Sequence, residues 1–306
     1  MIDGQSIYRG RFAPSPTGPL HFGSLVAALA SFLDARSRAG CWLLRIDDID
    51  PQREAPGAAS AIQEALLAFG LEWDGPVRLQ SQRQGDYARA MAELERRGLA
   101  YPCACSRREI SRIARPGPNG PVYPGTCRNG LPPGGEARTL RVRVDDAHVT
   151  FVDGLQGEQA CELGGAVGDF VIRRADWRVA YHLAAALDDG AADISHVVRG
   201  YDLLWCTPPQ LYLMELLGLT PPRYLHLPLA VNPAGQKLSK QTHAAPLDTN
   251  RPERQLHQAL CFLRQRPPES LTRASVRESL DWAVAHWDLA PLAGLRESPV
   301  PAAIAG

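Results

Sequence analysis

The sequence lacks an excess of charge of either sign, because 33 Lys and Arg residues balance 33 Asp and Glu residues. It also lacks an apolar run of the roughly 18 residues that a membrane-spanning helix needs. Its first six residues, M-I-D-G-Q-S, contain neither the basic nor the apolar region of a secretory signal. These absences predict a cytoplasmic protein with no membrane partner. The zero net charge means that charge gives no argument for or against a nucleic-acid partner.

Cysteine is scarce and irregularly spaced, with seven residues among 306. An odd number of cysteines in a chain predicted to be cytoplasmic indicates thiols or metal ligands rather than a disulfide framework. We expect Cys41, Cys206 and Cys261, which have apolar neighbours in the sequence, to be core residues. The length of the chain suggests two domains, or one large domain that carries an insertion.

The N-terminal third has the pattern of strand, helix and strand. Residues 8–13 predict a short strand, which ends in a cluster of Pro, Ser, Thr and Gly. Apolar residues at helical spacing predict a helix over 25–39, and the apolar run 41–46 predicts a buried parallel strand. This βαβ unit predicts an α/β fold. Two further helices are expected at 58–69 and 87–97.

The pattern changes after the last of these helices. Residues 101–135 are rich in Cys, Pro, Gly and Arg and have little periodicity, which indicates an inserted small module. Alternating apolar residues predict two hairpins, one from 141–145 with 149–152 and one from 170–174 with 179–181.

The α/β pattern then resumes, with a strand expected at 194–198 between helices at 183–187 and 203–217. Helices at 251–264 and 275–286 are expected to form a C-terminal bundle, and the tail after Pro291 is expected to be poorly ordered. The predicted organisation has four parts: the first half of the α/β domain at 1–100, the inserted module at 101–175, the second half of the α/β domain at 176–225, and a basic loop with a helical domain at 226–306.

Residues 11–24, R-F-A-P-S-P-T-G-P-L-H-F-G-S, join the first strand to the first helix. Free backbone N–H groups at the start of that helix, together with the helix dipole, favour phosphate oxygens. Gly18 and Gly23 would let a ligand approach the backbone, and His21 can reach the same anion. The alternative is an ordinary Pro-Gly turn with His21 at the surface.

Residues 236–241, Q-K-L-S-K-Q, follow a turn at Gly235. Two lysines on a mobile loop can neutralise the charge that builds up on a phosphorus centre. Taken alone, the segment is also typical of a solvated basic loop.

The two segments together resemble the signatures of the class I glutamyl-tRNA synthetases, R-F-A-P-S-P-T-G-x-L-H-x-G and K-M-S-K-S. The resemblance covers roughly residues 8–240 and includes 44–50, L-R-I-D-D-I-D, and 198–204, V-R-G-Y-D-L-L. It implies a Rossmann-like catalytic domain that uses ATP and Mg²⁺ to form glutamyl-adenylate, with His21 and Lys240 as the catalytic residues that stabilise phosphate charge. The implied ATP-binding residues are His21, Gly23, Ser24, Lys237, Leu238, Ser239 and Lys240.

A pocket for glutamate must hold two carboxylates and one ammonium, which requires arginine and at least one acid. The resemblance implies that Arg11 reads the side-chain carboxylate and that Asp47 holds the ammonium. The whole implied pocket consists of Arg11, Phe12, Ala13, Pro14, Ser15, Asp47, Tyr181 and Arg199. Asp47 departs from the family, which has the longer glutamate there. Without the resemblance, the favoured interpretation would be structural. Arg11 and Arg199 would form strand-end ion pairs, Tyr181 would be a core aromatic and Asp47 a helix cap.

Three cysteines inside the irregular segment form the candidate metal site: Cys103, Cys105 and Cys127. Three thiolates close a tetrahedral zinc site when a fourth ligand is present, and a small module without a visible core often needs such a staple. Zinc chemistry favours His148 or Cys161 as the fourth ligand. The resemblance implies Tyr123 instead, because short relatives of the family have a C-x-C…Y-x-x-x-C zinc site. The alternative is that the cysteines are unligated thiols on a loop.

About 65 residues follow Lys240, too few for the anticodon-reading domain of a full glutamyl-tRNA synthetase. The short relatives with this layout are the glutamyl-queuosine tRNA(Asp) synthetases. They imply transfer of glutamate to queuosine at the wobble position of tRNA(Asp), with the anticodon loop in the active site. Arg107, Arg108 and Arg112 are candidate phosphate contacts or part of a solvated basic face. We expect a monomer. The alternatives are a truncated synthetase that charges tRNA(Glu) and a non-catalytic paralogue that binds nucleotide or RNA.

Overall fold

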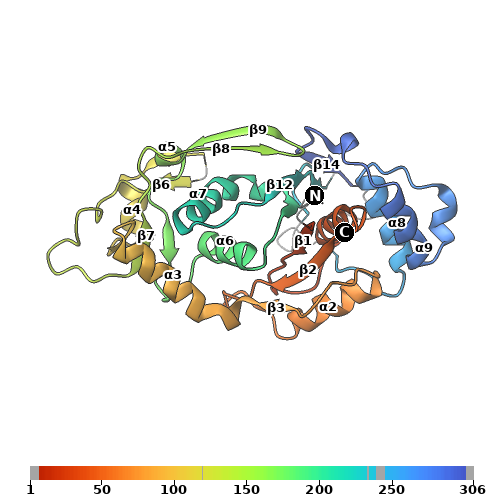
Figure 1. The fold of residues 1–306 in the computed structure, drawn as a ribbon, viewed down its shortest axis with the longest axis horizontal. Coiled ribbons are helices and arrows are strands. Elements are labelled where there is room, and N and C mark those ends of the chain that lie inside the picture. The colour runs from red at the N-terminus through yellow and green to blue at the C-terminus, as the bar shows by residue number, and fades with distance from the viewer. Residues whose placement is uncertain (1–6, 119, 233, 239–244, 301–306) are drawn as a thin grey trace, which may run out of the picture.

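The computed structural model describes residues 7–118, 120–232, 234–238 and 245–300. The molecule is elongated, with helices α8 (Pro252–Phe262) and α9 (Val276–Ala285) at one end and helix α4 (Arg107–Ile113) at the other (Figure 1). Parallel strands and the helices that cover them lie between these ends. None of the helices in the described ranges is both long and apolar enough to span a membrane.

The N-terminal strands form a parallel sheet in the order β1 (Arg9–Phe12), β2 (Cys41–Ile46), β3 (Arg78–Leu79). Helix α1 (Phe22–Arg36) connects β1 to β2 and is buried on almost every side, because strands pack on one side of it and α8 and α9 on another. The predicted βαβ unit is therefore confirmed. The helices α2 (Ala58–Ala68) and α3 (Gln84–Arg96) also confirm the predicted periodicity.

The second half of the α/β domain adds a second sheet beside the first. Strands β11 (His196–Gly200) and β12 (Arg223–Leu227) are parallel, and the backbone N–H of Ser195 donates to the carbonyl of Arg9 at 3.0 Å, which places β11 next to β1. Helices α6 (Tyr181–Ala191) and α7 (Thr207–Leu217) flank these strands. Because the proline pair at the start of α7 fixes its first turn, the segment before it is a 3₁₀ helix, η2 (Tyr201–Cys206), and not the predicted α-helix.

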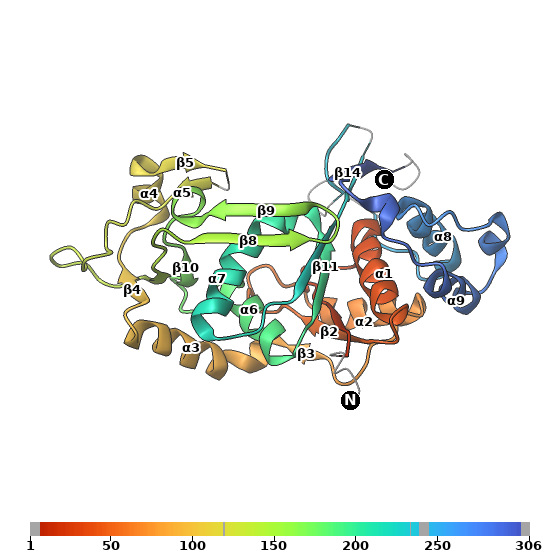
Figure 2. The same cartoon turned by 45° about the horizontal axis from the view of Figure 1, so that its top comes forward.

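The pairing predicted for the first hairpin is wrong. Strand β8 (His148–Asp153) pairs with β9 (Gly157–Glu162), and this long hairpin lies against α7 (Figure 2). Strand β7 (Thr139–Val142) lies instead between β4 (Ala100–Cys103) and β10 (Val171–Arg173). Alternation marks a half-buried strand, but it does not identify a partner that is distant in the sequence.

Three other expectations also need correction. The described part of the tail is ordered, because β14 (Glu297–Pro299) pairs with β13 (Leu229–Val231). Cys261 is exposed, since α8 turns Leu256 and Leu260 to the core instead, and Cys41 and Cys206 are only partly buried.

The remaining short elements are η1 (Gln80–Arg83), β5 (Arg115–Gly117), β6 (Gly120–Val122), α5 (Leu163–Ala166), η4 (Glu269–Arg273) and η5 (Ala290–Leu292). The division into four segments stays a prediction.

Candidate active site and metal site

The two sequence signatures meet at the start of α1. His21 precedes the helix, and its Nδ1 accepts a hydrogen bond from the backbone N–H of Ser24 at 3.3 Å. A Cβ atom added to Gly23 would lie 3.2 Å from the His21 ring and 3.7 Å from the carbonyl oxygen of Leu238. Gly23 is therefore the point at which the first signature and the lysine-containing segment come together, far apart as they are in the sequence.

The lysine-containing segment is described only up to residue 238. Leu238 is buried, and its backbone N–H donates to the carbonyl of Ala230 at 2.8 Å. The ammonium of Lys237 pairs with Asp202, which follows β11. Ser239 and Lys240 lie outside the described residues, so their predicted roles stay predictions.

Four residues of the predicted glutamate pocket converge at the carboxyl edge of the parallel strands. Arg11 lies in β1, Asp47 follows β2, Arg199 lies in β11, and Tyr181 begins α6. Burial raises the pKa of Tyr181. The charges of Arg199 and Arg11 lower this pKa, and the charge of Asp47 raises it. These three charged side chains therefore all lie within electrostatic reach of the Tyr181 hydroxyl. This edge is where ligands bind in open α/β sheets.

A cavity of about 80 Å³ opens at this point. Ser15, Asp47 and Tyr181 line it together with Asp50 and Arg174. Other predicted pocket residues contribute differently. The ring of Phe12 is buried and stacks on Trp42, with 6.3 Å between ring centroids, so the side chain belongs to the core. The carbonyl of Pro14 accepts the backbone N–H of Asp47 at 2.9 Å, and Ala13 is partly buried.

A buried ion-pair network supports Asp47 and Arg11. The Nε of Arg45 lies 2.6 Å from Asp47, and the same guanidinium lies 2.6 Å from Asp189. Arg11 reaches Asp189 only through longer contacts of 3.3 and 3.4 Å. Although burial opposes it, Arg11 and Arg45 hold the pKa of Asp189 below its ordinary value. Asp189 thus fixes the arginine without taking all of its donors, which leaves Arg11 able to bind a carboxylate.

The next carboxylate, Asp188, extends the network. Its oxygens accept hydrogen bonds from Arg83 at 2.7 Å, Gln80 at 2.7 Å and Tyr87 at 2.8 Å. Three arginines (Arg11, Arg45 and Arg83) then balance three aspartates (Asp47, Asp188 and Asp189). Buried charges are tolerable only when they are paired in this way.

Arg199 is held from several sides. Its Nε donates to Nε2 of His226 at 3.0 Å, and its other nitrogens donate to Gln210 at 2.9 Å and Thr207 at 2.8 Å. Nδ1 of His226 faces Asp153 at 2.6 Å. Burial lowers the pKa of His226, against the opposing effect of Asp153. Because Arg199 donates to Nε2, that nitrogen carries no proton and the imidazole is neutral. The hydroxyl of Thr207 lies 3.3 Å from the same nitrogen.

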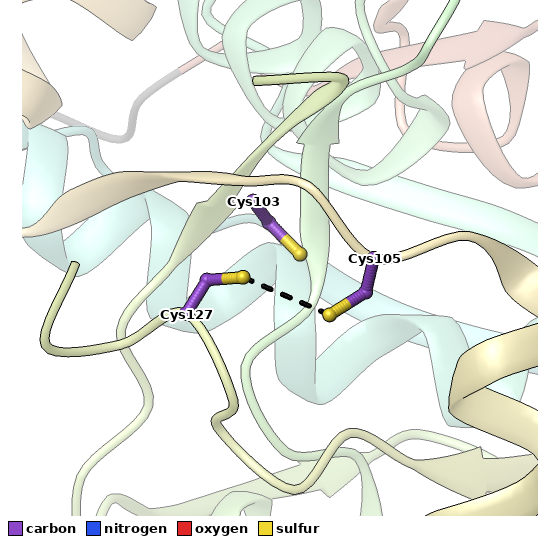
Figure 3. A group of neighbouring side chains, drawn as sticks. All are labelled: Cys103, Cys105 and Cys127. Atoms are coloured by element: carbon purple, nitrogen blue, oxygen red, sulfur yellow. Dashed lines mark hydrogen bonds between the residues drawn. The ribbon is translucent and has the colours of Figure 1, made fainter. Parts of the chain in front are cut away.

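The three predicted cysteine ligands also come together, and their side chains point toward one another (Figure 3). The Sγ atoms of Cys103, Cys105 and Cys127 all lie within 4.8 Å of one another, and those of Cys105 and Cys127 are 3.7 Å apart. Zinc bound to thiolates at about 2.3 Å in tetrahedral geometry would place sulfurs about 3.8 Å apart. The donor set therefore fits a metal ion of this kind.

Tyr123 is placed beside this cluster. Its hydroxyl lies 3.3 Å from the sulfur of Cys103 and 3.6 Å from that of Cys105. In the ranges described, neither His148 nor Cys161 joins the three-cysteine group. Arg141 donates from Nε to the sulfur of Cys103 at 3.3 Å. Burial raises the pKa of Cys103, but the hydrogen-bonding contacts with Tyr123 and Arg141, together with the charge of Arg141, outweigh burial and bring that pKa to about 7.

Sequence reasoning missed Arg45, Asp189, His226 and Asp153. Two adjacent aspartates in an otherwise apolar helix, and a histidine inside the apolar strand β12, are signals that could have identified two of them. The candidate RNA contacts Arg107, Arg108 and Arg112 are exposed on or beside α4, and nothing in the structure tests their role.

Known proteins resemble the chain over most of its length. A family model for the catalytic domain of class I tRNA synthetases (E and Q) matches residues 8–260. The glutamyl-Q tRNA(Asp) synthetase of Dechloromonas aromatica is 54% identical over 284 residues, which are 92% of this chain and 94% of that protein. The protein of the same name from Aromatoleum aromaticum is 51% identical over 298 residues, 97% of this chain and 94% of that protein.

Solved structures show the same fold. A glutamate-tRNA synthetase from Elizabethkingia anophelis superimposes with a TM-score of 0.79 at 25% identity, covering 98% of this chain and 69% of that one. A glutamate tRNA ligase from Elizabethkingia meningosepticum, solved in complex with its amino acid, has the same TM-score and covers 97% of this chain.

Proposed function

Because the chain belongs to the class I tRNA synthetases of the glutamate and glutamine family, we propose that it activates glutamate with ATP and transfers it to queuosine of tRNA(Asp). The main structural support for this proposal comes from the position of four residues. Arg11, Asp47, Tyr181 and Arg199 converge on one edge of the sheet, in a chain that is similar along nearly its whole length to glutamyl-Q tRNA(Asp) synthetases.

In the proposed first step, two arginines bind the two carboxylates of glutamate and Asp47 binds its ammonium. The α-carboxylate attacks the α-phosphorus of ATP, and pyrophosphate leaves. His21, Lys237 and Lys240 stabilise the phosphate charge, and Mg²⁺ accompanies the ATP. Gly23 lets the two signatures approach each other, and its lack of a side chain leaves room for the nucleotide. Positioning and electrostatics supply this step, and no covalent enzyme intermediate is needed.

Asp47 reaches less far than the glutamate that the family has at this position. Its carboxylate is gripped by Arg45 through contacts of 2.6 and 3.4 Å, so its direction is fixed. We infer that these contacts with Arg45 hold the Asp47 carboxylate in the orientation that binds the substrate ammonium. The ammonium would then lie closer to the backbone of residue 47 than it does in relatives that have glutamate there.

In the proposed second step, a hydroxyl of the queuosine ring of the wobble nucleotide attacks the acyl carbon of glutamyl-adenylate, the acyl–phosphate bond breaks, and AMP leaves as the ester forms. A single-stranded loop can offer such a nucleotide to the cavity because its bases are splayed out of the stack. We infer that one chain suffices for both steps, since Arg11, Asp47, Tyr181 and Arg199 all come from the same chain, and that the enzyme works where tRNA is found, in the cytoplasm.

We also propose that Cys103, Cys105, Cys127 and Tyr123 hold one structural zinc ion. The cluster supports this by the distances between its sulfurs and by the position of the Tyr123 hydroxyl. When bound, the metal would fasten β4 to the segment around Cys127 in a module with a small core.

Transfer of labelled glutamate to RNA tests the acceptor. RNA from cells that make queuosine should be labelled, and RNA from cells that lack it should not. Equal labelling of both would refute the queuosine acceptor and favour a synthetase that charges tRNA(Glu). Removal of the label by mild base, together with retention of the label after the 3′ end is trimmed, would place it on the loop.

A further inference from the structure

The turn between β10 and α6 presents a tryptophan to solvent. Trp177 is 67% exposed, whereas Trp42 in the core is completely buried. Burying an indole removes a large apolar area from water, so folded proteins seldom leave one outside. Trp177 belongs to none of the hydrophobic clusters formed by the described residues. Packing within this chain therefore does not explain why a tryptophan stands here.

The backbone at this position is also unfavourable for tryptophan. Trp177 has a φ angle of +64°, in the left-handed region that glycine adopts without steric cost and in which a bulky residue is strained. Hydrogen bonds hold the turn closed, from the N–H of Trp177 to the carbonyl of Arg174 at 3.0 Å and from the N–H of Arg174 to the carbonyl of Arg178 at 2.7 Å. A strained residue held in place by its surroundings points to a use for its side chain.

An arginine covers one face of the indole. The guanidinium carbon of Arg173 lies 4.1 Å from the ring centroid, and among the described residues no carboxylate forms an ion pair with Arg173. Arg174 and Arg178, in contrast, both contact Asp176. The turn thus combines a flat aromatic surface with an uncompensated positive charge. Unpaired bases stack on such aromatic surfaces, and arginine attracts the phosphates that connect them.

The turn stands at the mouth of the proposed active site. Arg174 lies three residues before Trp177, donates to Asp50 at 2.9 Å, and lines the same cavity as Asp47 and Tyr181. A nucleotide that enters this cavity must bring its neighbours in the loop close to this turn.

We propose that Trp177 is a docking surface for the RNA substrate, on which an unpaired base of the tRNA loop stacks. The proposal rests on the proposed function, because it takes tRNA as the molecule that enters the cavity. The strain at Trp177 is then the cost of holding the indole outward.

The test compares three variants for tRNA transfer kinetics and for thermal unfolding. Trp177→Ala should raise the KM for tRNA by roughly 5- to 150-fold, the range expected for loss of one base–aromatic stack. It should leave glutamate-dependent ATP–pyrophosphate exchange without RNA unchanged. Trp177→Phe should retain most of the affinity. Trp177→Gly should lose affinity as Trp177→Ala does, yet unfold at or above the wild-type temperature, since glycine relieves the strained φ angle.

Asp193→Gly is a matched control. Asp193 is exposed and also has a positive φ, of 49°, but it lies at the far end of α6. This variant should keep the wild-type KM for tRNA. An unchanged KM in both Trp177→Ala and Trp177→Gly would overturn the proposal, and so would an equal loss in Asp193→Gly. If the wild type shows no exchange with glutamate, the proposed function fails, and direct binding of tRNA to wild type and Trp177→Ala still decides the role of Trp177: equal affinities refute it.

Discussion

Arg199 donates a hydrogen bond from its Nε to Nε2 of His226 across 3.0 Å, and Nδ1 of His226 faces Asp153 at 2.6 Å. Since a guanidinium can only donate, Nε2 must be unprotonated and the ring proton must lie on Nδ1. The position of Arg199 therefore depends on a neutral His226. All three side chains are buried.

This dependence predicts a pH effect on glutamate binding. Burial and the charges of Arg199 and Arg11 lower the pKa of His226, while Asp153 raises it, and the net shift is downward. We expect the KM for glutamate to be flat above pH 6.5, the ordinary histidine value, and to rise only below it, when a second proton on Nε2 repels Arg199. Exchange kinetics measured from pH 8 down to pH 5 check this.

The variant His226→Gln should weaken glutamate binding and remove that pH effect, because glutamine offers no titrating ring. We expect a KM for glutamate about tenfold higher, with the KM for ATP unchanged. His196→Gln is the control, since His196 stacks on Tyr8 and does not contact Arg199 in the described structure. If the pH profile of His226→Gln is identical to that of the wild type, the position of Arg199 does not depend on the protonation of His226.

Asp47→Asn should impair glutamate activation specifically. The substitution removes the charge proposed to bind the ammonium and leaves Arg45 with one carboxylate fewer. We expect a loss of about 2–4 kcal/mol in kcat/KM for glutamate, typical of breaking a buried charge pair. If Asp47→Asn keeps the wild-type kcat/KM, another group binds the ammonium.

Metal content tests the cysteine cluster. The purified protein should contain about one equivalent of zinc, and Cys103→Ser should lose it, because three ligands bind zinc far less tightly than four. Cys261→Ser, which changes an exposed cysteine outside the cluster, should keep the metal. Tyr123→Phe tests whether Tyr123 is the fourth zinc ligand. An unchanged zinc affinity in this variant would show that Tyr123 is not a ligand.

The partly buried His182 predicts a loss of stability in acid. Burial lowers its pKa from 6.5 to about 4. Between these values the unfolded chain binds a proton that the folded chain does not, so the free energy of unfolding falls as the pH drops from 6.5 to 4. The contribution is on the order of 1–3 kcal/mol. Denaturant unfolding at pH 7.5 and pH 5 should show a smaller difference in His182→Gln than in the wild type.

Local pattern was sufficient for the elements that lie close together in the sequence. The spacing of apolar residues in α1 and the compact run of β2 predicted the first βαβ unit, since each signal depends only on residues within one segment. The partner of β7 could not be predicted, because β4 and β10 lie on either side of it in space and many residues away in the chain.

The same distinction holds for the site. Arg11 and Tyr181 were predicted from a resemblance between motifs, which records residue types at fixed spacing. Asp189 was not predicted, although it contacts Arg11 and Arg45 from 178 and 144 residues away. Such contacts depend on how α6 packs against β1 and β2, and no local pattern reports that packing.

Glutamate-dependent exchange of pyrophosphate into ATP, measured without RNA, tests the central claim most directly. The account predicts exchange with glutamate, much weaker exchange with glutamine or aspartate, and loss of exchange when Arg11 or Arg199 is replaced by alanine. Absence of exchange with glutamate, or faster exchange with another amino acid, would contradict it.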